Sequence, residues 1–242
     1  MKALVLAAGL GSRLHDLTRD LPKALVLLHD EPLLGHVLRW LRGSATIESI
    51  GVVAGFHADL VRGWLASHAP DVQLFENPEY RAGNLLTLCA ARDYAQGDLL
   101  ICNVDHLYHP AMRAQMITPA THITAIVDHD RTLGPDDMKV TLDGHGRLAA
   151  IHKTLATWDC GYIGATQIPA AWQAAYWQAV AQTQARHGTL SCVEWVLGEL
   201  VATNVPVHVM DVSGHGWVEI DEPADLRRAA DFLRQRPPRP PL

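Results

Sequence analysis

Residues 1–28, MKALVLAAGLGSRLHDLTRDLPKALVLL, contain the pattern that decides the fold. Residues 2–7, KALVLA, form an apolar run that ends in small side chains, which is typical of a buried parallel strand. The next segment, from Ala8 to Arg13, has too much glycine to continue as a strand or to begin a stable helix. It predicts a turn whose backbone closely approaches another chemical group. Two cationic residues, Arg13 and Lys23, lie nearby in the sequence.

Length and composition limit the classes of protein that the chain can be. With 242 residues, 48% of them hydrophobic, it can form one large domain, which we expect over residues 1–236. Residues 237–242, PPRPPL, predict a disordered proline-rich tail. No apolar run reaches the roughly 18 residues of a membrane span. The N-terminus lacks the pattern of a signal peptide.

Cysteine spacing and charge point to a compartment and limit the partners. The four cysteines are widely spaced and include no C-x-x-C pair, which favours a reduced, cytoplasmic protein over a disulfide framework. The formal net charge of −6 argues against a nucleic-acid partner. A bound phosphate group would therefore need local cations or a metal ion. The oligomeric state stays open.

Strand-like and helix-like segments alternate in the first half of the chain. Apolar runs predict strands at 2–7, 49–55, 71–76, 98–105 and 122–128. Between them, apolar stripes at helical spacing predict helices over 32–43, with Asp30 as N-cap, and over 57–68 and 85–95. This order predicts an α/β fold, a Rossmann-like three-layer sandwich with a mostly parallel sheet. In such sheets, ligands bind at the carboxyl ends of strands, where the glycine loop and Asp105 both fall.

The second half predicts a smaller, less regular part. Residues 139–151 look like a β-hairpin turning at Asp143–Gly146, followed by helices at 170–185 and 191–202, a strand at 205–212 and a helix from 223. Trp172, Tyr176 and Val180 repeat at helical spacing and predict core packing.

Two common phosphate-binding motifs do not fit the opening loop. A Walker A loop needs G-K-[ST] leading into a helix, and a dinucleotide fingerprint needs a third glycine where Leu14 stands. The stretch instead continues as a predicted loop to Leu21-Pro22-Lys23, because proline disfavours helix in the residue before it. From the glycines alone, an ordinary turn with incidental charges remains an alternative interpretation.

The combination L-A-A-G-L-G-S-R-L with L-P-K-A-L resembles the signature of the nucleotidyltransferases that activate sugar phosphates and related alcohols. The resemblance implies that the loop wraps a nucleoside triphosphate, with Arg13 and Lys23 on its phosphates as catalytic cations. Successive N–H groups of such a loop form an anion nest, which suits that role. The nucleotide-binding residues that it implies here are Leu6, Ala8, Gly9, Gly11, Ser12, Arg13 and Lys23.

The resemblance continues along nearly the whole chain. Asn77, Gly83 and Asn84 fall where relatives recognise the base, in a segment similar to that of cytidylyltransferases acting on inositol phosphate and phosphocholine. The amide group of an asparagine offers both a hydrogen-bond donor and an acceptor, which can pair with the edge of a cytosine base. As an alternative, Asn84 suits a helix N-cap.

Mg²⁺ is the cofactor that the resemblance implies. Asp105 ends the strand DLLICNVD and would bind both nucleotide and metal, since carboxylates are good Mg²⁺ ligands. A second carboxylate comes from W-V-E-I-D at 217–221, where either Glu219 or Asp221 suits the role, although Asp221 also suits a helix cap. A transition-metal cluster of Asp105, His106 and His109 is a weaker alternative. The sequence D-H-L-Y-H at residues 105–109 resembles that of inositol-1-phosphate cytidylyltransferases in particular.

The acceptor residues rest on the same resemblance, which implies that the hairpin and helical part of the second half binds the acceptor. Lys153 would pair with the acceptor's phosphate, Asp159 and Gly161 would lie beside the alcohol, and Lys139 is a weaker candidate for the phosphate. From the residues alone, an exposed lysine after a strand, such as Lys153, is more often a solvated charge. A trimethylammonium acceptor would need an aromatic or acidic pocket, which Trp158, Tyr162 and Trp217 are candidates to supply.

The expected reaction joins CTP to a phosphorylated alcohol, with inositol 1-phosphate as the first candidate, and releases pyrophosphate. Phosphocholine, 2-aminoethylphosphonate and sugar 1-phosphates are alternative acceptors. A catalytically inactive nucleotide-binding regulator is an alternative of another class, which would lack the loop cations or the metal carboxylates. The missing third glycine disfavours a dinucleotide-dependent oxidoreductase.

Overall fold

The computed structural model describes residues 1–234, and a nine-stranded sheet runs through them. Its central strand β1 (Lys2–Ala7) pairs in parallel with β4 (Ser49–Ala54) and β6 (Leu99–Asn103). Alternate side chains of β1 enter two different apolar cores, with Val5 on one face of the sheet and Leu4 on the other. A strand that is apolar on both faces needs a helical layer on each side.

The sheet has the strand order β10-β9-β11-β6-β1-β4-β5, with β8 and β12 branching from β11. Besides the three central strands, it contains β5 (Gln73–Glu76), β8 (Thr124–Asp128), β9 (Lys139–Leu142), β10 (Leu148–His152), β11 (Cys160–Ile168) and β12 (His208–Asp211). Short pairs β2–β3 (Leu27–Leu28, Glu31–Pro32) and β7–β13 (His106–Tyr108, Trp217–Glu219) lie outside it.

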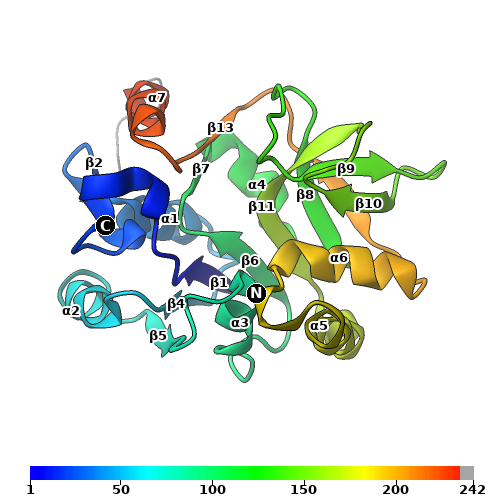
Figure 1. The fold of residues 1–242 in the computed structure, drawn as a ribbon, viewed down its shortest axis with the longest axis horizontal. Helices are drawn as coiled ribbons and strands as arrows, with labels where there is room; N and C mark the ends of the chain where they lie inside the picture. The colour runs from blue at the N-terminus through cyan, green and yellow to red at the C-terminus, as the bar shows by residue number, and fades with distance from the viewer. Residues whose placement is uncertain (235–242) are drawn as a thin grey trace.

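Helices cover both faces of the sheet, so the fold has three layers (Figure 1). One face packs against α1 (Leu33–Arg42), α2 (Ala58–His68), α4 (Arg113–Met116) and α7 (Pro223–Arg234). The other packs against α3 (Asn84–Cys89), α5 (Gln173–His187) and α6 (Val193–Ala202). The predicted α/β sandwich is thus confirmed, as is the β9–β10 hairpin. No helix among residues 1–234 is long and apolar enough to cross a membrane.

Strand β11 was missed by the sequence reasoning. It is buried along its nine residues and runs antiparallel to β6, β8 and β9. The registers imply that seven strands of the sheet point one way, while β10 and β11 point the other. Because β11 joins the parallel half to the hairpin, it fixes where the predicted acceptor part lies.

Several local predictions need correction. The stretch Ser12–Thr18 is not all loop: it forms short 3-10 turns (η1), because Leu14 and Thr18 are buried and anchor it. Asp30 does not cap α1, since it lies in the β2–β3 turn at φ +62°, and Pro32 precedes the helix. Helix α3 ends early, at Cys89.

The predicted aromatic stripe on α5 does pack in the core. Tyr176 and Val180 are buried in the cluster that α5 shares with α6, and Trp172 packs against its edge. The predicted division into a domain over 1–236 and a proline-rich tail stays a prediction, because residues 235–242 lie outside the described residues.

Candidate active site

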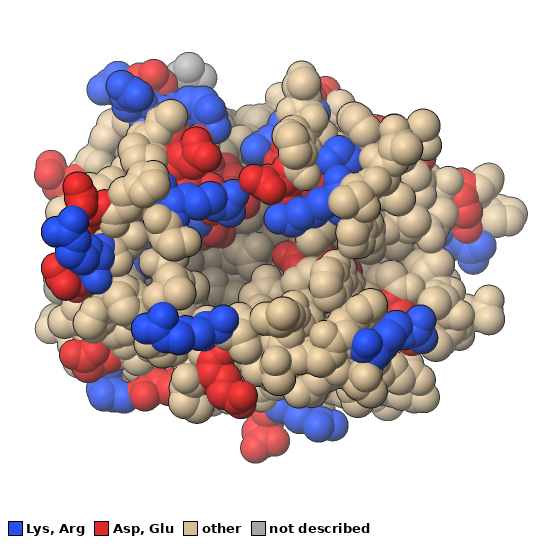
Figure 2. All heavy atoms as spheres, in the orientation of Figure 1, with Lys and Arg blue, Asp and Glu red and all other residues tan. Residues whose placement is uncertain are grey.

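The carboxyl end of β6 opens into a cavity of about 490 Å³. Figure 2 shows this face of the molecule hollowed at its middle, with acidic and basic side chains side by side along the rim. The walls come from segments far apart in the sequence: Arg13, Asn84, Asn103, residues 136–138, residues 152–154 and the first turn of α6. In open parallel sheets, ligands bind at this edge, where the carboxyl ends of the strands meet.

A smaller cavity of about 140 Å³ adjoins the first, and both are lined by Asn84, Asn103 and Asp105. Its remaining lining includes Leu6, Ala8, Gly9 and Lys23 from the opening segment, so the predicted nucleotide loop does face a hollow. Gly11 and Ser12 are not among its lining residues. Gly11 instead adopts φ +65°, and its carbonyl accepts from the Thr18 hydroxyl, which folds the loop back on itself.

Lys23 lies between two carboxylates that are far away in the sequence. Its Nζ is 2.5 Å from Oδ2 of Asp105 and 2.6 Å from Oδ1 of Asp221, and the residue is 6% exposed. Burial acts to lower the pKa of Lys23, but the two carboxylates outweigh it and raise that pKa. Burial likewise opposes ionisation of Asp105, yet Lys23 and His106 hold its pKa well below the usual range. Lys23 and Asp105 are therefore both charged at neutral pH.

Arg13 makes a second bridge at the rim. Its Nη2 lies 2.7 Å from Oδ2 of Asp221, and its Nη1 lies 3.1 Å from Oδ2 of Asp136. The alternative in which Asp221 caps α7 is wrong, since its carboxylate faces Lys23 and Arg13. In the first turn of α7, the carboxylate of Asp225 accepts the N–H groups of Asp221 and Glu222, which precede the helix.

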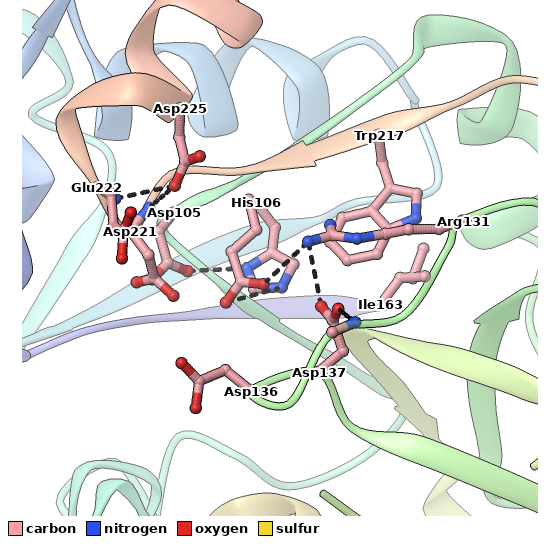
Figure 3. Close-up of polar contacts among 12 residues, drawn as sticks. Asp105, His106, Arg131, Asp136, Asp137, Ile163, Trp217, Asp221, Glu222 and Asp225 are labelled. Atoms are coloured by element: carbon pink, nitrogen blue, oxygen red, sulfur yellow. Dashed lines mark hydrogen bonds and ion pairs between the residues drawn. The ribbon is translucent and has the colours of Figure 1, made fainter. Parts of the chain in front are cut away.

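Asp105, His106 and Glu219 form a group with the composition of a metal site (Figure 3). One ligand atom from each lies within 4.8 Å of the others. His106 Nδ1 is 2.8 Å from Oδ1 of Asp105, and its Nε2 is 4.0 Å from Oε1 of Glu219. Carboxylate oxygens fit a hard divalent cation, whereas the imidazole adds an affinity for softer metals. His109 is not in this group; its Nδ1 accepts from the N–H of Ala111.

The ring of Trp217 supports this group from behind. It stacks on His106 at 5.3 Å with an interplanar angle of 5°, and the Arg131 guanidinium lies 4.4 Å from its ring centroid (Figure 3). Nη2 of Arg131 in turn lies 3.1 Å from Oδ1 of Asp137 and 4.0 Å from Oε2 of Glu219. Burial raises the pKa of Glu219 to about 7; His106 opposes that shift, and Asp105 adds to it.

The base-recognition candidates lie close together but differ in what they face. Asn77 is 3% exposed, donates to the Thr87 hydroxyl and accepts from the N–H of Glu79, so both ends of its amide are used inside the protein. Asn84 lines both cavities, and its Oδ1 accepts from the N–H of Val193. It does not cap its own helix, whose N-cap is Gly83.

Only one of the four acceptor candidates lines the cavity. Lys153 does, and within residues 1–234 its ammonium forms no ion pair with a carboxylate. Lys139 is buried and donates to the carbonyls of Gly134 and Lys153, so it supports the wall from behind. Asp159 accepts from the N–H of Leu142.

Gly161 pairs within the sheet with Asp128 and Lys139, away from the cavity. The three aromatic residues proposed for a trimethylammonium pocket do not gather either. Tyr162 lines the cavity, but Trp158 lies over the ammonium of Lys139 and Trp217 is covered by His106 and Arg131.

Sequence reasoning missed several lining residues, namely Asn103, Asp136, Asp137, Glu194 and Trp195. Asn103 sits two positions before Asp105 at the end of the same strand, and that spacing was a usable signal. The signal for Glu194 was weak, because it is one of two carboxylates in a mostly apolar helix.

A glycine loop at the end of the first strand, two loop cations and a carboxylate group at the adjacent strand end define the class of nucleotide-binding α/β transferases. A family model described as the MobA-like NTP transferase domain matches residues 3–199. The chain belongs to this nucleotidyltransferase family, and cytidylyltransferases are among its relatives.

Two curated relatives and one solved structure illustrate the likeness. The bifunctional IPC transferase and DIPP synthase of Rubrobacter xylanophilus is 27% identical over 242 residues, which cover 96% of this chain and 51% of that protein. The CTP:phosphoglutamine cytidylyltransferase of Campylobacter jejuni is 31% identical over 136 residues, 53% of this chain and 53% of that protein. The chain thus spans about half the length of these relatives.

The solved structure is that of the inositol-1-phosphate CTP transferase from T. maritima. It superposes with a TM-score of 0.82 at 22% identity, over 97% of this chain and 95% of that one. At this level of identity the superposition establishes the shared nucleotide-diphospho-sugar transferase fold.

Proposed function

We propose that the protein is a cytidylyltransferase, which joins CTP to a phosphorylated alcohol and releases pyrophosphate. The observation that carries the proposal is the convergence of Arg13, Lys23 and Asp105 beside the glycine-loop cavity, with Lys153 across the adjoining one. CTP is favoured as the nucleotide because it appears in the name of a curated relative and in that of a solved structure with the same fold.

The chemistry needs positioning and charge neutralisation more than a strong base. An oxygen of the acceptor's phosphate forms a bond to the α-phosphorus of CTP, and the bond from that phosphorus to the bridging oxygen of the pyrophosphate breaks in line with it. The attacking oxygen is already anionic, so no side chain has to remove a proton. The two substrates are both polyanions, and fixed cations at the site offset their repulsion.

Three basic residues of the chain would share this task. Lys23 and Arg13 face the loop cavity and the rim, and they would stabilise the charge that develops on the leaving pyrophosphate. Lys153, from the other wall, would attract the acceptor's phosphate. Because Lys23 and Arg13 are paired with carboxylates here, the triphosphate has to compete with Asp105 and Asp221 for them.

The donor set fits a divalent cation such as Mg²⁺. Asp105 together with Glu219 or Asp221 would hold it, and when bound it would offset the negative charge of the triphosphate. Of the two candidates, Glu219 shares the compact group with Asp105.

For the acceptor we propose a class of compound, the phosphorylated alcohols, and not a single substrate. The sequence favours inositol 1-phosphate, and the T. maritima fold relative carries that substrate in its name. Phosphocholine, 2-aminoethylphosphonate and sugar 1-phosphates are the other acceptors that the sequence leaves open.

The test is pyrophosphate release in the presence of Mg²⁺, measured over four nucleoside triphosphates and a panel of these acceptors. Release with CTP and one acceptor class supports the proposal. If no acceptor gives pyrophosphate release while CTP still raises the melting temperature of the protein, a nucleotide-binding regulator would be favoured instead.

A further inference from the structure

The carboxylates that line the larger cavity differ in how their charge is balanced. Six line it, and five of them have a basic side chain within 4.0 Å, namely Asp105, Asp136, Asp137, Glu219 and Asp221. The sixth, Glu194, forms no ion pair with any lysine, arginine or histidine among residues 1–234.

Glu194 is also well shielded from water. It is 8% exposed, although it stands in the first turn of α6 and lines the cavity. A carboxylate near a helix N-terminus stabilises the helix dipole, but that interaction does not require burial. An ionised carboxylate that leaves water without a counter-charge costs free energy, which a ligand with a positive charge would recover.

The neighbours of Glu194 do not supply that charge. The thiol of Cys192, which also lines the cavity, is uncharged and only a weak donor. The hydroxyl of Tyr162 pairs with that of Thr166 at 2.8 Å, so its hydrogen bond is made elsewhere. Trp195, next in the helix, presents an aromatic side chain to the same cavity.

The cavity therefore holds two unbalanced charges of opposite sign. Lys153, after β10, is the positive one, and α6 packs directly on β10, so both charges face the same space. A ligand that satisfies both has a phosphate or phosphonate at one end and a cation at the other. Aromatic rings beside the carboxylate suit an alkylammonium group.

We infer that Glu194 is the specificity-determining residue for the acceptor, and that the acceptor is a phosphorylated or phosphonate compound with a positively charged amine. This inference rests on the proposed cytidylyltransferase function. It departs from the inositol 1-phosphate favoured by the sequence, since inositol carries hydroxyl groups and no positive charge.

The experiment compares acceptors that differ only in the cation. Pyrophosphate release with CTP is measured for phosphoethanolamine and 2-hydroxyethyl phosphate, for phosphocholine, for 2-aminoethylphosphonate and 2-hydroxyethylphosphonate, and for inositol 1-phosphate. We expect the best kcat/KM with an amine-bearing acceptor, and at least a tenfold lower value for its hydroxyl counterpart.

The variant Glu194→Gln keeps the shape and removes the charge. It should raise KM for the amine-bearing acceptor by roughly 30- to 4000-fold, the range for losing one partner of a buried charge pair. The KM for CTP should stay the same. Glu199→Gln is the matched control, because Glu199 is buried on the same helix but pairs with Arg186 and does not line the cavity.

Each outcome has a distinct meaning. Preference for inositol 1-phosphate or for the hydroxyl compounds would overturn the inference and leave the proposed function intact. An unchanged acceptor KM in a folded Glu194→Gln protein would also overturn it. No pyrophosphate release with any acceptor, charged or neutral, would contradict the proposed function itself.

Discussion

Arg13 and Asp136 are 123 positions apart in the chain, yet Nη1 of the arginine lies 3.1 Å from Oδ2 of the aspartate. The same guanidinium reaches Asp221, so one side chain joins the glycine loop, the segment before β9 and the segment before α7. An anion that binds to Arg13 must displace or share these carboxylates. The rim of the site is therefore held by the same charges that substrates would use.

The first prediction concerns Lys23. Replacing it with alanine should lower kcat by about 10²- to 10³-fold, the usual cost of removing an electrostatic stabiliser. Steady-state pyrophosphate release at saturating CTP and acceptor measures the change. Near-normal turnover would contradict the proposed role.

Lys23 should also compete with the metal ion. In the absence of nucleotide its ammonium neutralises Asp105 and Asp221, so Lys23→Met should bind Mn²⁺ about tenfold more tightly than the wild type. Titration followed by Mn²⁺ electron paramagnetic resonance measures the free ion directly and needs no catalysis. Equal affinities would show that the ammonium does not compete for these carboxylates.

Glu219 and Asp221 should behave differently when neutralised. Glu219→Gln removes a donor of the compact group, so the Mg²⁺ concentration for half-maximal rate should rise at least tenfold. Asp221→Asn instead releases Lys23 and Arg13, and it should change the KM for CTP more than the Mg²⁺ requirement. The reverse pattern would assign the metal to Asp221.

Thiol reactivity offers a test of the charge on Glu194. Burial first, and the Glu194 carboxylate second, raise the pKa of Cys192 to about 12, four units above pH 8. A thiolate fraction of about 10⁻⁴ at pH 8 then makes alkylation slow. Glu194→Gln should lower the pKa of Cys192 and speed its alkylation, as followed by peptide mass spectrometry, whereas Glu199→Gln should not. Equal rates in both variants would argue against an ionised Glu194.

Gly83 should tolerate no side chain. A Cβ there would lie 1.9 Å from the carbonyl oxygen of Ser191, so Gly83→Ala should cost about 1–3 kcal/mol in the free energy of unfolding. Gly63 is the matched control, since a Cβ on it meets nothing within 4 Å and alanine favours its helix by about 1 kcal/mol. Urea unfolding of both variants measures the difference, and a neutral Gly83→Ala would refute the close contact.

Sequence reasoning placed the nucleotide side of the site better than the acceptor side. Gly9 and Asp105 were found because parallel strands end at one edge of a sheet, so residues after β1 and β6 must be neighbours, whereas Lys23 came from the resemblance to the nucleotidyltransferase signature. Their assigned roles stay predictions, but their proximity followed from the topology.

The acceptor side depended on contacts that no local pattern reveals. Lys139 and Asp159 looked like site residues, yet their side chains satisfy backbone groups around β9. A polar residue in a sequence does not show whether it will face a ligand or a carbonyl. Glu194 reaches the cavity only because α6 packs on β10, and that contact depends on the unpredicted strand β11.

The contact between Gly83 and Ser191 has a consequence for how the protein can evolve. The N–H of Gly83 donates to Thr189, that of Leu85 donates to Ser191, and Asn84 holds the N–H just before Glu194. The segment proposed to read the base and the turn that presents Glu194 are therefore one rigid wall. A graft that exchanges one without the other would break the hydrogen bonds between them. Under the proposed roles, base choice and acceptor choice would be inherited together, and a redesign would have to transplant residues 77–85 and 188–195 as a single unit.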